Sequence, residues 1–152
     1  MLYNWLIQLI LKLLNLIKQK NKGDNISFKV AIASEDGLFI DEHFGRAPKF
    51  LIFNVHENGS FELIESRKNI PPEEYLKNHD QALNKIINKV ADCRFVLAEK
   101  IGPDAKEKLN YNHIRAYELN NSIEEALERL SAVVYRNYLS NFSKNHFKAS
   151  IK

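Results

Sequence analysis

The sequence predicts one α/β domain built on a five-stranded mixed sheet flanked by helices. Short apolar runs typical of buried strands alternate with amphipathic helical segments in the second half of the chain. An Asn58-Gly59 pair between two strand-like runs indicates a tight antiparallel hairpin. The chain has 152 residues, 45% of them hydrophobic and 27% charged, which is the composition of one folded domain.

Three strands are predicted in the first part of this domain. Phe28 to Ala33 is an apolar run that we expect to be buried. Lys49 to His56 and Phe61 to Ser66 lie on either side of the Asn58-Gly59 turn, so we expect these two strands to be antiparallel neighbours.

Two strand-helix units follow. A helix over Asp80 to Val90, with its apolar residues on one face, precedes a strand over Arg94 to Ala98. A helix over Pro103 to Leu109, with proline in its first turn, precedes a strand over Ile114 to Tyr117. Short connections between such units imply right-handed crossovers and parallel pairing.

The last predicted element is a helix that opens with a capping box, Ser122 with Glu125. With it, the domain spans residues 26–136, and residues 137–152 are expected to be a basic C-terminal tail. A hairpin followed by two parallel strand-helix units is the layout of a ribonuclease-H-like three-layer domain.

Residues 1–25 are predicted to be an apolar amphipathic helix over 2–17 and a polar linker. Asn4, Gln8, Lys12 and Asn15 form one narrow polar stripe on that helix. Sixteen residues fall short of the roughly 20 that span a bilayer, and no basic leader or cleavage site marks a secretion signal. Three roles stay open: packing on the domain or a second copy as a homo-oligomer, contact with a membrane surface, and membrane spanning.

Charge and cysteine content exclude some functions. Residues 28–135 carry 14 basic and 18 acidic side chains, whereas both ends of the chain are basic, so the domain itself lacks the basic face that nucleic acid requires. The single cysteine, Cys93, excludes an internal disulfide and an all-cysteine metal site. We expect a cytoplasmic protein, peripheral to the membrane if the apolar helix contacts lipid.

The loop from Ser34 to Ala47 is the best candidate for a functional site. It places His43 on a turn directly after the first strand, where the scaffold holds the imidazole and leaves it open to a ligand. Parallel strands share the edge at their carboxyl ends, so we expect Lys100 and Gly102 near His43. The helix that begins after Gly102, together with Arg46 and Lys100, suits an anionic ligand.

Other candidate residues are assigned structural roles. Cys93 precedes the fourth strand, which spans about 17 Å, so we expect it at the far edge, buried and too distant to share a metal with His43. Three acidic residues are expected to form turns: Asp36, Asp41 and Glu42. The remaining histidines lack a partner at metal-ligand spacing: His56, His79, His113 and His146.

Several motifs of this chain, taken in order, resemble the dinitrogenase iron–molybdenum cofactor biosynthesis domain family. The resemblance covers Phe28 to Tyr135. That family includes small nitrogenase cofactor carriers and the carboxy-terminal domain of the nitrogenase cofactor-maturation radical enzyme. The motifs that carry the resemblance are Asp36-Gly37, Asp41-Glu-His-Phe-Gly-Arg-Ala47, Ala91-Asp-Cys-Arg94, Ile101-Gly-Pro103 and Ser122-Ile-Glu-Glu-Ala-Leu127.

This resemblance implies a non-enzymatic carrier that binds an iron-sulfur-containing cluster, the iron–molybdenum cofactor or a precursor, and passes it to a cofactor-assembly or acceptor metalloprotein. His43 is then the metal ligand, and Gly45, Arg46, Lys100 and Gly102 surround the cluster. Many relatives carry a second histidine at the position of Arg46, and the radical-enzyme branch has glycine and cysteine where this chain has residues 70–79 without either.

Two alternatives remain. The first is an interaction module that keeps the fold but binds no cluster and is tethered to a membrane or a partner by residues 2–17. The second is a metal-dependent nuclease, which requires carboxylates converging on two metal ions. The first strand, Phe28 to Ala33, carries no carboxylate, so this alternative ranks last.

Overall fold

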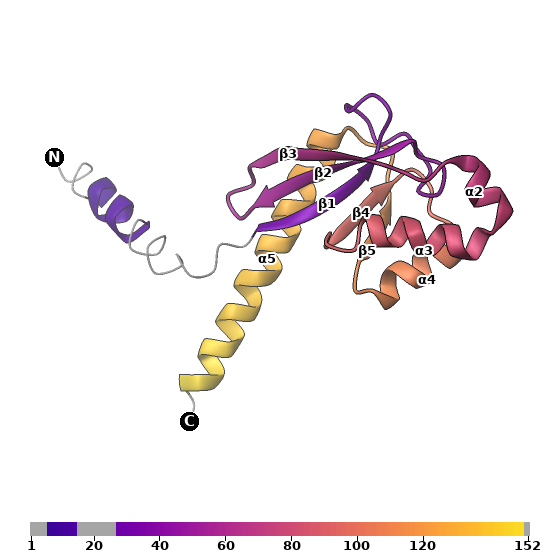
Figure 1. The fold of residues 1–152 in the computed structure, drawn as a ribbon. Coiled ribbons are helices and arrows are strands. Elements are labelled where there is room, and N and C mark those ends of the chain that lie inside the picture. Colours follow the sequence, from indigo (N-terminus) through magenta and orange to yellow (C-terminus); the bar gives the residue numbers. More distant parts are fainter. Residues whose placement is uncertain (1–5, 15–26, 151–152) are drawn as a thin grey trace.

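The structure, a computed structural model, describes residues 6–14 and 27–150 of the chain. Within the second range, five strands form one mixed sheet, as predicted, and their order is β3-β2-β1-β4-β5 (Figure 1). Helices cover both faces of this sheet. The elements are β1 (Ser27–Ala33), β2 (Lys49–His56), β3 (Phe61–Lys68), α2 (Pro72–Lys77), α3 (His79–Lys89), β4 (Phe95–Ala98), α4 (Pro103–Tyr111), β5 (Arg115–Glu118) and α5 (Ile123–Ser150).

The hairpin between β2 and β3 forms where Asn58-Gly59 predicts it. Gly59 has φ +84°, a left-handed conformation that glycine adopts without steric cost. The Asn58 side chain accepts a hydrogen bond from the Ser60 amide at 3.0 Å and so closes the turn. Strands β2 and β3 are therefore antiparallel neighbours.

The strand pairing between β1 and β4 places the candidate site. These strands are parallel, with Val30 opposite Phe95 and Ile32 opposite Leu97. Strand β5 continues the sheet in parallel beside β4. The carboxyl ends of all three strands therefore lie at one edge of the sheet, as expected.

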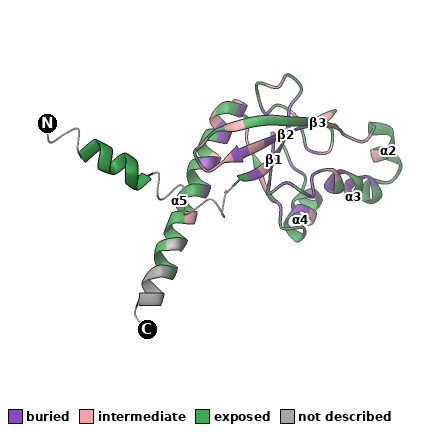
Figure 2. Ribbon diagram, turned by 60° about the vertical axis from the view of Figure 1, so that its left-hand side comes forward, coloured by how far each residue is buried: buried purple, intermediate pink, exposed green. Residues whose placement is uncertain are grey.

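Two hydrophobic clusters separate the layers. One lies between the sheet and helices α3 and α4, and includes Phe44, Leu83 and Leu109. The other lies between the sheet and α5, and includes Phe95 and Leu127. Buried residues accordingly follow the sheet and the inner helix faces (Figure 2).

Two features of the helices differ from the expectation. Helix α2 was not predicted, although Pro72 in its first turn, with Glu73 and Glu74, is a typical helix start. Helix α5 continues to Ser150, so residues 137–150, expected as a tail, are helical. Its second half extends beyond the sheet (Figure 1), where there is no core to impose an apolar period on its sequence.

Residues 6–14 form a helix whose side chains are all exposed. The rest of the predicted 2–17 helix, and the linker after it, lie outside the described residues. Among the helices that the structure describes, none is long and apolar enough to cross a membrane.

Candidate functional site

The loop between β1 and β2 is built by local hydrogen bonds. The carboxylate of Asp36 accepts from the backbone amides of Leu38 and Phe39 at 2.8 and 3.0 Å, and these bonds lower the pKa of Asp36. Asp41 accepts from the Glu35 amide at 3.0 Å. The prediction that Asp36 and Asp41 form turns is therefore confirmed.

The start of α5 holds the first half of this loop. Phe39 and Ser122 form an isolated antiparallel bridge. The Ile40 amide donates to the Asn121 carbonyl at 3.0 Å, and the Ile123 amide donates to the loop in return, at the Leu38 carbonyl. The loop is thus fixed to a segment far away in sequence.

The second half of the loop is fixed to the residues that follow β4. His43 and Lys100 form an isolated parallel bridge. The Phe44 amide donates to the Lys100 carbonyl at 2.9 Å, and the Glu99 amide donates to the Glu42 carbonyl at 3.0 Å. Phe44 is fully buried, whereas the His43 side chain is exposed. The backbone at His43 is anchored on both sides, and its imidazole is open to solvent.

A single helical turn follows His43. Its carbonyl accepts from the amides of Arg46 and Ala47 at 3.1 and 2.8 Å. The Asn69 side chain donates to the Ala47 carbonyl at 2.9 Å and closes the turn against the end of β3. Arg46 is exposed on this turn, and Gly45 faces helix α2.

Tyr75 on α2 and His79 at the start of α3 lie beside this turn. A Cβ on Gly45 would lie 3.1 Å from the Tyr75 hydroxyl, so the tyrosine packs directly against the glycine. The same hydroxyl lies 2.7 Å from His79 Nε2, and the two rings are 4.6 Å apart. The sequence interpretation gave His79 no partner because it missed α2. The Pro72 start of that helix was the available signal.

Charges of both signs lie around His43. Arg46 and Lys100 are exposed cations, as expected. Glu42 directly precedes His43, and partial burial, together with the neighbouring Asp41 and Glu35, raises the pKa of its carboxyl group. The edge of the sheet is therefore of mixed charge rather than purely cationic.

The start of α4 is the open side of the site. Gly102 is the N-cap residue, and a Cβ placed on it would meet nothing within 4 Å. Beside it, Glu118 accepts from the Ile101 amide at 3.0 Å, which lowers the pKa of Glu118, and Lys106 pairs with the same carboxylate at 3.0 Å. There is room for a ligand above the helix terminus.

The described residues do not form a site for a bare metal ion. Across 6–14 and 27–150, no three histidine, cysteine or acidic side chains converge in a metal-binding arrangement. Cys93 lies at the opposite end of β4 from Lys100 and is 4% exposed, as predicted. Burial raises the pKa of its thiol to about 12, so it is protonated at neutral pH.

His56 and His113 lie apart from the His43 turn. His56, at the far end of β2, is 3.3 Å from Glu62, and His113, with φ 60°, forms the turn before β5. The side chain of His146 lies outside the described residues.

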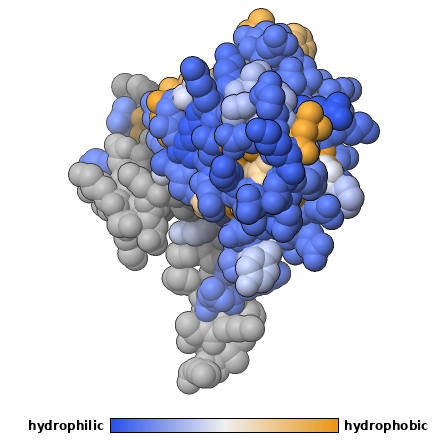
Figure 3. All heavy atoms as spheres, turned by 45° about the vertical axis from the view of Figure 1, so that its right-hand side comes forward, coloured by the Kyte–Doolittle hydropathy of each residue, from blue (hydrophilic) through white to orange (hydrophobic). Residues whose placement is uncertain are grey.

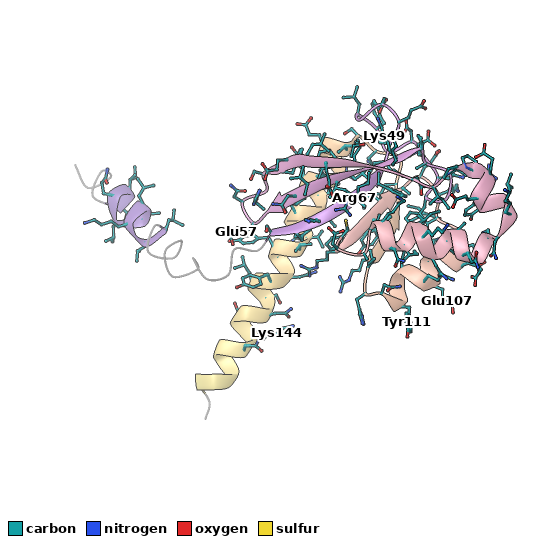
Figure 4. The ribbon with its side chains drawn as sticks, viewed as in Figure 1. Lys49, Glu57, Arg67, Glu107, Tyr111 and Lys144 are labelled. Atoms are coloured by element: carbon teal, nitrogen blue, oxygen red, sulfur yellow. The ribbon has the colours of Figure 1, made fainter. Side chains whose placement is uncertain are left out.

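A recess of about 770 Å³ lies elsewhere, between α3 and α4. Lys108 crosses it to Asp80 and Asn84 at 2.8 and 2.7 Å, which satisfies its charge internally. Figure 3 brings this side of the molecule forward and shows a mainly hydrophilic face. Glu107 and Tyr111 on α4 are among the residues that line the recess (Figure 4).

The fold and the anchored His43 turn define a small α/β domain whose candidate site lies on the edge shared by parallel strands. The sequence pattern of the family described as dinitrogenase iron-molybdenum cofactor matches residues 27–133, and the chain belongs to this family.

Two relatives are both described as FeMo cofactor biosynthesis protein NifB. The chain is 30% identical to the protein from Chlorobaculum tepidum over 64% of its own length and 32% identical to that from Sinorhizobium fredii over 72%. It spans only 22% of the length of either relative. The crystal structure of PH0822 has a similar fold, with a TM-score of 0.53 and 21% identity over 68% of this chain and 90% of that one.

Proposed function

We propose that this protein is a non-enzymatic carrier for an iron-sulfur-containing cluster, the iron–molybdenum cofactor or a precursor, in cofactor assembly. The observation that carries the proposal is the His43 turn: an exposed imidazole on a backbone anchored to Glu99 and Lys100. The family and the relatives described as FeMo cofactor biosynthesis proteins support the class of cargo.

The chemistry of the site fits reversible attachment. A bare transition-metal ion prefers three or four protein ligands, which the described residues around His43 do not supply. A preassembled cluster brings its own sulfide ligands, so that one imidazole can hold it and release it. Arg46 and Lys100 complement the negative charge of such a cluster, and Gly102 leaves space beside it, whereas the space beside Gly45 is filled by Tyr75.

A carrier also needs a donor and an acceptor. We infer that the cluster passes to a cofactor-assembly or acceptor metalloprotein in the cytoplasm, and that nucleic acid is not a partner. The sheet order supports the ribonuclease-H-like assignment of the domain.

Anaerobic loading tests this proposal. Isolated iron–molybdenum cofactor is added to the full chain, and iron, molybdenum and sulfide that co-elute with the protein are measured together with its visible spectrum. We expect retention by the wild type and a loss of more than about tenfold in affinity for His43→Ala. His56→Ala is the matched control, because His56 lies on the same sheet but at its opposite end, and it should retain the cluster.

A second candidate is the interaction module. The observation that favours it is the helix over residues 6–14, on which Leu6, Ile10 and Leu14 are about half exposed. If the wild type retains no cluster and no metal, this second function replaces the carrier. If the two histidine variants bind the cluster equally, His43 is not its ligand.

A further inference from the structure

A second recess lies at the end of the sheet opposite to His43, where α5 leaves the sheet. Its volume is about 390 Å³, within the range of small-molecule sites. It is formed by the first residues of β4 and β5 and by the middle of α5, and Lys144 lies on the part of α5 beyond the sheet (Figure 4). The residues that matter for its chemistry are Arg94, Phe95, Arg115, Tyr117, Tyr138 and Lys144.

This recess is cationic although the domain as a whole is acidic. Arg94, Arg115 and Lys144 line it, and none of its described lining residues is a carboxylate. Elsewhere in the domain, cations are paired with acidic side chains; for example, Lys108 pairs with Asp80. Arginine remains charged at every relevant pH, so cations gathered without a counter-charge create a positive potential that favours an anion.

Aromatic rings hold part of this charge in position. The Arg94 guanidinium lies 5.5 Å from the Phe95 ring centre and 5.6 Å from that of Phe28. Such contacts orient a guanidinium and leave its edge free to donate hydrogen bonds. Arg115 is the register partner of Phe95 on the neighbouring strand, so both arginines lie beside the same ring.

A flat surface completes the recess. Tyr117 stacks on Phe95, with ring centres 6.2 Å apart and an angle of 22° between the planes. Tyr117 is 42% exposed, so part of its ring remains available to a ligand. A planar ring of a ligand can extend this stack.

From these two features we infer that the recess binds a small phosphorylated ligand with a planar ring, of the nucleotide class. Arg94 and Arg115 provide paired donors that match phosphate oxygens, Lys144 adds a further charge, and Tyr117 contacts the ring. A nucleic-acid polymer does not fit, because the surrounding domain is acidic.

Calorimetric titration of the cluster-free full chain with ADP, pyrophosphate and adenosine tests this inference. We expect ADP to bind more tightly than either of its parts. Arg115→Ala should lower the affinity for ADP at least about tenfold, because a charged bidentate contact is lost. Tyr117→Ala should weaken the binding of ADP but leave the binding of pyrophosphate unchanged. Arg136→Ala, which removes the same charge from α5 outside the recess, should change ADP binding less than about twofold.

Three results would overturn the inference. They are the absence of ADP binding by the folded wild type, pyrophosphate binding as tightly as ADP, and equal weakening by Arg115→Ala and Arg136→Ala. Circular dichroism of each variant establishes that it is folded. Because no cluster is present in this experiment, its outcome is independent of the His43 test.

Discussion

The ion cluster around Asp92 allows a prediction of stability and its pH dependence. Arg67 donates to both Asp92 oxygens at 2.6 and 2.8 Å, and Lys29 donates to one of them at 3.0 Å. Arg67 also donates to the Lys89 carbonyl at 2.6 Å. The cluster thus connects β1 and β3 to the segment between α3 and β4. Among the described residues, Asp92 is the only anion that pairs with both Lys29 and Arg67, and Asp92→Asn removes its charge.

The expected loss can be worked from these contacts. Hydrogen bonds to charged groups contribute about 1.5–3 kcal/mol when protected from water. The Asp92 side chain is 46% exposed, so solvent screening reduces the expected loss for Asp92→Asn to about 1–2 kcal/mol. For a chain of this size, Tm should fall by about 3–6 °C. The matched control is Glu74→Gln, which breaks the more exposed pair with Lys85 and should cost less than about 0.5 kcal/mol.

The pH dependence has a definite sign. Arg67 and Lys29 hold the pKa of the Asp92 carboxyl well below its usual range. A carboxyl whose pKa is lower in the folded state contributes stability above its unfolded pKa of about 3.9, and this stability is lost as pH falls towards the folded value. The free energy of unfolding should therefore differ between wild type and Asp92→Asn by its maximum amount at neutral pH and by less at about pH 3.

Urea unfolding followed by far-ultraviolet circular dichroism at these two pH values measures both effects. The reasoning is refuted if Asp92→Asn costs less than about 0.3 kcal/mol at neutral pH, or if the cost is the same at about pH 3.

Two further predictions concern single residues. At about pH 8, Cys93 should react with a thiol reagent more than a hundredfold more slowly in the native protein than in urea, because burial raises the pKa of the thiol to about 12. Fast labelling of the native protein would show that the thiol is accessible and would contradict this prediction. Gly59→Ala should destabilise the fold by about 1–2 kcal/mol in urea unfolding because φ is +84°, whereas Gly102→Ala, at φ −61° with open space around it, should be nearly neutral; equal costs would contradict this account.

The sheet was predictable because its signals are local. The Asn58-Gly59 turn fixes one antiparallel pair, and the short strand-helix connections fix the parallel ones. Parallel pairing of β1 with β4 then places His43 beside Lys100, as the structure shows. This step required no knowledge of side-chain packing.

The rest of the site depends on tertiary contacts that leave little trace in the sequence. Tyr75 reaches Gly45 only because α2 follows β3 at the same edge of the sheet, and α2 buries none of its residues fully, so it has no clear apolar period. The extension of α5 was missed for a related reason, since its second half leaves the core. Glu42, the residue before His43, contributes a negative charge beside the expected cations, and its partial burial, which raises its pKa, depends on tertiary packing.

The attachment of the His43 loop to α5 has a consequence for synthesis on the ribosome. The loop emerges early, but its partners Asn121 and Ile123 emerge only after the whole sheet. Until then, the first half of the loop lacks the backbone bonds that fix it, and contacts of such long sequence separation form late. A nascent chain therefore completes the anchoring of this loop only when the domain is nearly complete, whereas the bonds beside His43, to Glu99 and Lys100, can form earlier.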